Sequence, residues 1–79
     1  MHYVYILRSE VEPDRHYVGL TSDPNRRLAE HNEGKSIHTN KFKPWKKVVE
    51  IGFDDPAKAT AFEKYLKSGS GRAFAKKHF

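Results

Sequence analysis

The sequence contains no cysteine, so neither a disulfide framework nor a thiolate zinc site can stabilise its fold. It also lacks a long apolar run, because the apolar stretch at residues 3–7 is followed at once by Arg8, Ser9 and Glu10. That stretch is too short for a signal peptide or for a membrane-spanning helix. We therefore expect a cytoplasmic protein that does not bind membranes.

Acidic residues are fewer than basic ones. The chain has 15 Lys and Arg against 10 Asp and Glu, a formal net charge of +5, and its pI is near 9.6. This excess favours a polyanionic partner such as nucleic acid. On charge alone, a basic domain without such a partner is an equally good interpretation. The 79 residues suffice for a single compact domain spanning 1–79, and the hydrophobic fraction of 37% favours a folded chain.

The pattern of β-branched, aromatic and turn-forming residues predicts three strands. Residues 3–7 and 16–21 have strand composition, and the polar segment between them predicts an antiparallel hairpin. A third strand is expected over residues 48–53, where Val49 and Phe53 share one face with Ile51 between them. These strands form the sheet of the predicted fold.

Two Asp-Pro pairs predict the starts of helices. Asp23 and Asp55 can each accept a hydrogen bond as a cap, and the proline that follows suits the first helical position. Helices are expected over about residues 24–32 and 56–67, with a short final helix within residues 70–79. The predicted fold is α+β, with a three-stranded, mainly antiparallel sheet flanked by about three helices.

The hairpin carries tyrosines and a glycine that could belong to a site. Tyr5 and Tyr17 meet only if the register brings them together, and such a pair most often serves packing. Gly19 shares a face with Tyr17, and a glycine inside a strand marks a bulge or a close approach of another group. The functional interpretation is that Gly19 leaves room for a ligand beside Tyr17.

The first predicted helix places two polar side chains on one face. Arg27 and His31 are four residues apart, so they project in the same direction. Together they could bind a phosphate and transfer a proton. Taken alone, the residues favour the simpler interpretation of a solvated helix face.

The second predicted helix combines an apolar stripe with a carboxylate. Ala59, Phe62 and Leu66 follow the spacing of a buried face, and Glu63 falls within it. A carboxylate turned toward the apolar side needs a partner. That partner is either a lysine or a hard divalent cation, which oxygen ligands suit.

The segment between the first helix and the third strand is basic and aromatic. Phe42 and Trp45 are interleaved with basic side chains, so the segment could follow a phosphate backbone and stack a base. For Trp45 alone, a role as an anchor in the core is the stronger interpretation. The candidate nucleic-acid contacts here are His38, Lys41, Lys43 and Lys46.

Taken together, these residues resemble the GIY-YIG nuclease domain. Tyr3-Val4-Tyr5 resembles its first motif, Tyr17-Val18-Gly19 its second, and Phe62-Glu63 its metal-binding segment. Each motif alone is weak, but three in order over residues 3–68 are specific. The chain is most similar to short standalone bacterial members related to the nuclease domain of the excision-repair endonuclease, a likeness that extends to the tail containing Arg72.

The resemblance implies a metal-dependent endonuclease that hydrolyses phosphodiester bonds of nucleic acid. The expected substrate is DNA, cut with low sequence specificity during repair or recombination. Tyr17 would be the general base or would orient the attacking water, and Tyr5 would line the site. Arg27 would contact the scissile phosphate, with His31 nearby. Glu63 would hold one divalent metal, Mg²⁺ or Mn²⁺. Arg72 would join the nucleic-acid contacts.

The sequence also departs from the family pattern. Tyr3 replaces the glycine of the first motif, Val18 replaces an isoleucine, and Leu20 stands where some relatives have a lysine. Two alternatives therefore stay open: a catalytically silent nucleic-acid-binding module of the same fold, and a protein-interaction domain. A targeting protein partner is compatible with all of these functions, and the oligomeric state stays open.

Overall fold

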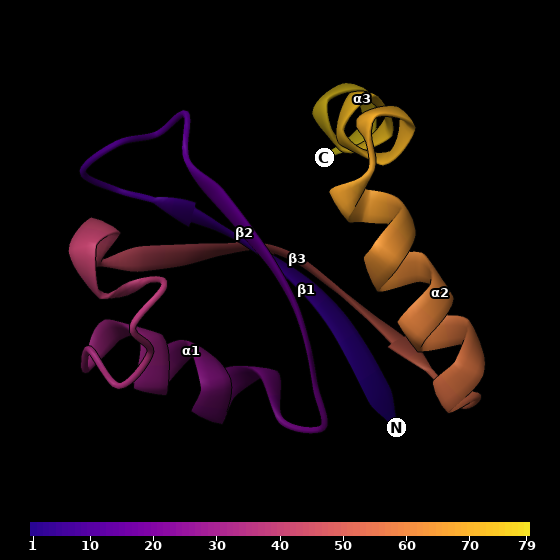
Figure 1. The fold of residues 1–79 in the computed structure, drawn as a ribbon. Helices are drawn as coiled ribbons and strands as arrows, with labels where there is room; N and C mark the ends of the chain where they lie inside the picture. Colours follow the sequence, from indigo (N-terminus) through magenta and orange to yellow (C-terminus); the bar gives the residue numbers. More distant parts are fainter.

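A computed structural model describes residues 1–79 as one sheet with helices on both faces (Figure 1). Its elements are β1 (His2–Ser9), β2 (His16–Thr21), α1 (Pro24–Asn32), the short 3-10 helix η1 (Asn40–Phe42), β3 (Trp45–Phe53), α2 (Pro56–Lys67) and α3 (Gly69–His78). The strands are antiparallel in the order β2-β1-β3. The predicted α+β fold is confirmed. None of the helices has the length and apolar character needed to cross a membrane.

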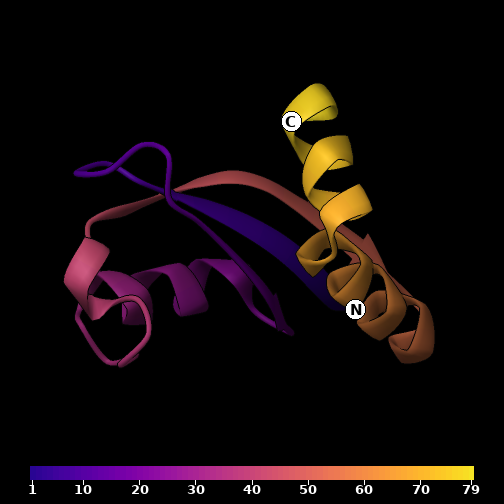
Figure 2. The ribbon, with the colours of Figure 1, turned by 45° about the horizontal axis from the view of Figure 1, so that its top comes forward.

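The central strand β1 divides the core into two parts, because its side chains alternate between the faces of the sheet. Val4 and Ile6 pack with α2 and α3, while Tyr5 and Leu7 pack with Trp45 on the face that α1 covers. Figures 1 and 2 show α1 on one side of the sheet and α2 with α3 on the other. Fully burying an aliphatic side chain such as Leu7 contributes about 1.5–3 kcal/mol.

The third strand differs from its predicted bounds. It begins at Trp45 rather than Val48, because residues 45–47 already pair with the end of β1. Ile6 pairs with Val49 and Leu7 with Lys47, which leaves Val48 as the extra residue of a bulge. The bulge interrupts the alternation, so Val48 and Val49 both pack against the core beneath α2.

The predicted helix caps are present. The carboxylate of Asp23 accepts from the backbone N–H of Arg26 at 3.1 Å, and that of Asp55 accepts from Ala57 at 2.8 Å. The last helix starts at Gly69, one residue before its predicted range, because Ser68 ends α2 and caps α3. A Cβ on Gly71 would overlap the backbone of Tyr65, so glycine allows this tight junction.

Candidate active site

The register of the hairpin brings its two tyrosines together. Tyr5 pairs with Gly19 and Leu7 pairs with Tyr17, so both tyrosines face the α1 side of the sheet as diagonal neighbours. Their ring centroids are 6.2 Å apart. Tyr17 also meets the ring of His31 edge-on, with centroids 4.9 Å apart. The structure therefore joins the two motif tyrosines to His31 in one aromatic cluster.

The space above Gly19 is filled by the protein itself. A Cβ built on Gly19 would lie 2.8 Å from Cε1 of Tyr5 and closer still to its hydroxyl oxygen. The pairing of β1 with β2 is uninterrupted along the hairpin, so no bulge is present there. The prediction of a close approach is confirmed. The prediction that Gly19 leaves room for a ligand is wrong, because the Tyr5 ring occupies that room.

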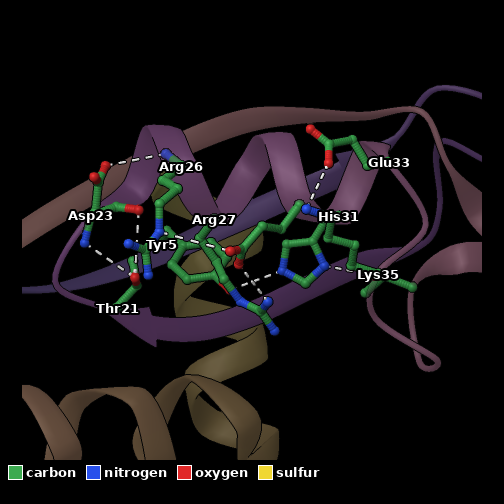
Figure 3. Close-up of polar contacts among 10 residues, drawn as sticks. Tyr5, Thr21, Asp23, Arg26, Arg27, His31, Glu33 and Lys35 are labelled. Carbon is green, nitrogen blue, oxygen red and sulfur yellow. Dashed lines mark hydrogen bonds and ion pairs between the residues drawn. The ribbon is translucent and has the colours of Figure 1, made fainter.

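His31 lies at the centre of a buried chain of hydrogen bonds, shown in Figure 3. Its side chain is fully buried, with Nε2 3.0 Å from the Tyr5 hydroxyl and Nδ1 2.6 Å from Oγ1 of Thr39. The solvated-face interpretation is therefore wrong for His31. Burial, and then the positive charge of Arg27, lowers the pKa of His31 below its usual value, which favours the neutral imidazole.

Burial also determines the protonation state of Tyr5. Burial, followed by the neighbouring Tyr17, raises the pKa of Tyr5 to about 12, although Arg27 partly offsets the shift. Tyr5 is therefore protonated at neutral pH, and its hydroxyl is hydrogen-bonded to Nε2 of His31. The neutral imidazole carries a single N–H, so it donates at one ring nitrogen and accepts at the other, with Tyr5 and Thr39 as the two partners.

Thr39 is a site residue that the sequence analysis missed. It is fully buried, and its backbone carbonyl accepts from Nε1 of Trp45 at 2.9 Å. Trp45 is itself 5% exposed, so the prediction of a core anchor is confirmed and base stacking by this side chain is excluded. Thr39 lies in an irregular segment without periodicity, and no pattern in the sequence pointed to it.

Arg27 is the accessible cation of the site. Its Nη1 donates to Oε1 of Glu30 at 3.0 Å, and about a third of its side chain is exposed. Arg26, on the solvent side, approaches the same carboxylate more loosely at 3.7 Å. Arg27, through its hydrogen bond, lowers the pKa of Glu30. Since a guanidinium has five N–H donors, Arg27 keeps donors available for a phosphate.

Glu63 lies away from this cluster. It belongs to α2, which covers the opposite face of the sheet, and its carboxylate pairs with Nζ of Lys67 at 2.6 Å. The lysine partner considered for this carboxylate is therefore present. No group of three or more His, Cys, Asp or Glu side chains gathers anywhere in residues 1–79. Glu63 fits a divalent cation only as a single carboxylate ligand, with water and a substrate phosphate completing the coordination.

The candidate nucleic-acid contacts divide between two surfaces. His38, Lys41 and Lys43 are exposed in the segment that joins α1 to β3. Lys46 is exposed on β3 and pairs with Arg8, so its side chain lies on the face that α2 and α3 cover. Arg72 is exposed on α3, on that same face of the sheet. The predicted nucleic-acid contacts therefore do not all lie on one face of the sheet.

Comparison with known proteins places this arrangement in a family. The sequence profile of the GIY-YIG catalytic domain matches residues 1–77. The chain belongs to the GIY-YIG family. The predicted resemblance is thereby confirmed, and the cluster around Tyr5 and Tyr17 contains both strand motifs of this GIY-YIG domain.

Several relatives share the domain within longer chains. Over 66 residues the chain is 38% identical to structure-specific endonuclease subunit SLX1 of Scheffersomyces stipitis, covering 76% of this chain and 19% of that protein. The SLX1 subunit of Candida dubliniensis is 42% identical over 71 residues, covering 81% and 25%. An SLX1 homolog of Giardia intestinalis is 34% identical over 65 residues, covering 77% and 18%.

These relatives refine the expectations from the sequence. The chain spans only 18–25% of their length. Their names agree with the predicted endonuclease class. They are eukaryotic proteins, so they do not support the expected grouping with bacterial members.

Proposed function

We propose that this GIY-YIG domain is a divalent-metal-dependent endonuclease that cuts DNA at branched or single-stranded structures. The observation that carries the proposal is the joining of Tyr5, Tyr17 and His31 in one cluster, with Arg27 beside it. This cluster supplies a phosphate-binding cation and positioned hydroxyl groups in one place. Phosphodiester hydrolysis requires both.

The two tyrosines have different roles. Tyr5 is buried, protonated and hydrogen-bonded to His31, so it supports the site and does not act as a base. Tyr17 is half-buried, and its hydroxyl takes part in none of the side-chain hydrogen bonds within the protein. Tyr17 is therefore the group that orients the attacking water or accepts its proton.

Charge stabilisation would come from Arg27 and, when bound, from a divalent cation held by Glu63. Arg27 can bind two phosphate oxygens at once and balance the negative charge that develops on the phosphoryl group. A bound Mg²⁺ or Mn²⁺ would supply neutralisation of the leaving oxygen. Glu63 would hold this cation, which then competes with Lys67 for the carboxylate.

The relatives support a choice of substrate. They are named structure-specific endonuclease subunits, and a domain of 79 residues has little surface for reading bases. We therefore assign selection to the shape and strand state of DNA and not to its sequence. The word subunit in those names also supports a partner chain that targets the nuclease.

A cleavage assay tests this function. Labelled single-stranded, duplex, flap and four-way DNA is incubated with the protein and Mg²⁺ or Mn²⁺, and EDTA serves as the metal-free control. Arg27→Ala and Glu63→Ala should abolish cutting, by at least about a hundredfold, the scale on which single transition-state contacts act.

Each changed residue has a control of the same charge. Arg26→Ala removes a neighbouring guanidinium that is 75% exposed, and Glu33→Gln removes a carboxylate that also pairs with a lysine. Both should cut like the wild type. If folded protein binds DNA and cuts no substrate with either metal, the catalytically silent binding module replaces the proposed function.

A further inference from the structure

A groove of about 890 Å³ lies on the α2 and α3 face of the sheet, next to the turn that connects β1 and β2. Its floor is apolar and includes Ile6, Val18 and Leu66. Basic side chains surround the floor and come from both strands of the hairpin and from α2 and α3: Arg8, His16, Lys67, Arg72 and Lys76. The single acidic side chain in the lining is Asp14. The groove therefore combines an apolar base with a strongly cationic rim.

We propose that this groove holds a single strand of nucleic acid, with phosphates on the basic rim and bases against the apolar floor. The rim is complementary in charge to a phosphate backbone. An apolar floor suits unpaired bases, whose faces stack on aromatic and apolar side chains, whereas a duplex keeps those faces inside. Phe79 lines the groove and is 43% exposed, which provides an aromatic surface for a base.

The dimensions of the groove agree with this occupant. A volume of about 890 Å³ falls within the roughly 300–1,000 Å³ of sites that enclose drug-sized molecules. Such a site accommodates a few nucleotides of one strand and is too small to enclose a duplex. The proposal rests on the nuclease function above and specifies its substrate class as DNA with an unpaired strand.

The position of the groove also connects catalytic groups that lie on opposite faces of the sheet. Tyr17 lines the groove, and its ring contacts His31 on the α1 side. Lys67 lines the groove from α2 and pairs with Glu63. A strand in the groove therefore lies beside Lys67, the partner of the carboxylate proposed to hold the metal, whereas the Tyr17 ring faces the α1 side. A substrate that extends from the groove across the β2 edge of the sheet would reach both the Tyr17 ring and Glu63.

A binding experiment without divalent metal tests the groove separately from catalysis. Fluorescence anisotropy measures the affinity of the protein for a labelled single-stranded oligodeoxynucleotide and for its duplex in EDTA over a range of salt concentrations. The test variant is Arg72→Ala/Lys76→Ala, and the matched control is Lys64→Ala/Lys77→Ala. Each pair removes two positive charges, one of them from the last turn of α3. The other charge comes from Arg72 near the start of α3 in the test variant and from Lys64 on α2 in the control. Lys64 and Lys77 do not line the groove.

The two pairs should behave differently. The groove variant should bind the single strand at least about tenfold more weakly, and its salt slope should fall by about 1.4, since each phosphate contact to a single strand contributes about 0.7. The control should change affinity less than about threefold. Phe79→Ala should weaken single-strand binding about fivefold or more and leave the salt slope unchanged, as expected for the loss of stacking.

Each result has a defined meaning. Equal weakening by the two pairs would show that net charge alone binds DNA and would overturn the groove. Unchanged binding by the groove variant, or an equal loss for duplex and single strand, would do the same. Wild-type protein that binds the single strand through the groove but cuts no DNA would leave this proposal standing and refute the nuclease function.

Discussion

Replacing Gly19 with alanine should strongly destabilise the protein. The new Cβ would lie 2.8 Å from Cε1 of Tyr5 and nearer still to the hydroxyl oxygen, which is shorter than any normal contact. Tyr5 is 2% exposed and is bound to His31, so its ring has no open space to enter. Either the ring moves and breaks that hydrogen bond, or β2 moves away from β1.

The magnitude follows from these two costs. Overpacking of a tight core costs about 1–3 kcal/mol, and a buried donor left unpaired costs a similar amount. A total of about 3 kcal/mol is a large part of the roughly 5–15 kcal/mol that stabilises a typical domain. For a domain of this size each kcal/mol lowers Tm by about 4–8 °C, so we expect a decrease of about 12–24 °C.

Thermal and urea denaturation followed by circular dichroism measures this change. Gly69→Ala is the matched control, because a Cβ there meets nothing within 4 Å. Gly69→Ala should leave the free energy of unfolding unchanged or raise it by up to about 1 kcal/mol, because alanine reduces the conformational entropy of the unfolded chain. Adding Tyr5→Phe to Gly19→Ala should rescue stability only in part, since the ring carbons still overlap the Cβ. A loss below about 1 kcal/mol for Gly19→Ala would refute the packing argument.

Three further predictions follow from the site. Thr39→Val should lower the free energy of unfolding by about 1–3 kcal/mol by leaving Nδ1 of His31 without a hydrogen-bond partner, and Thr39→Ser should restore most of it, as measured in urea. Because burial lowers the pKa of His31, the unfolded chain binds a proton that the folded protein does not bind. The free energy of unfolding of the wild type should therefore fall relative to that of His31→Gln as the pH drops below about 6.5, by up to about 1.4 kcal/mol per pH unit. Above that pH the stability profiles of the two proteins should run parallel. Parallel pH profiles throughout would contradict the assigned burial of a neutral imidazole. Lys67→Met should tighten Mn²⁺ binding by up to about fivefold in calorimetry by removing the competitor for Glu63, whereas Lys64→Met should not.

Local patterns in the sequence determined most of the fold. Strand composition, the two Asp-Pro caps and the polar hairpin connection each act over a few residues, so they could be interpreted without the tertiary structure. The order of the motifs also identified the family, and with it the pair Tyr5 and Tyr17. The start of β3 was misplaced because its pairing partner, the end of β1, is distant in sequence.

Tertiary structure decided what surrounds each site residue. Spacing along α1 showed that Arg27 and His31 share a direction, but only packing shows that one is accessible and the other is fully buried between Tyr5 and Thr39. Likewise, the glycine at position 19 signalled a close approach without identifying the group that approaches. Burial and pKa depend on side chains brought together from distant parts of the chain, and periodicity along one element carries no information about them.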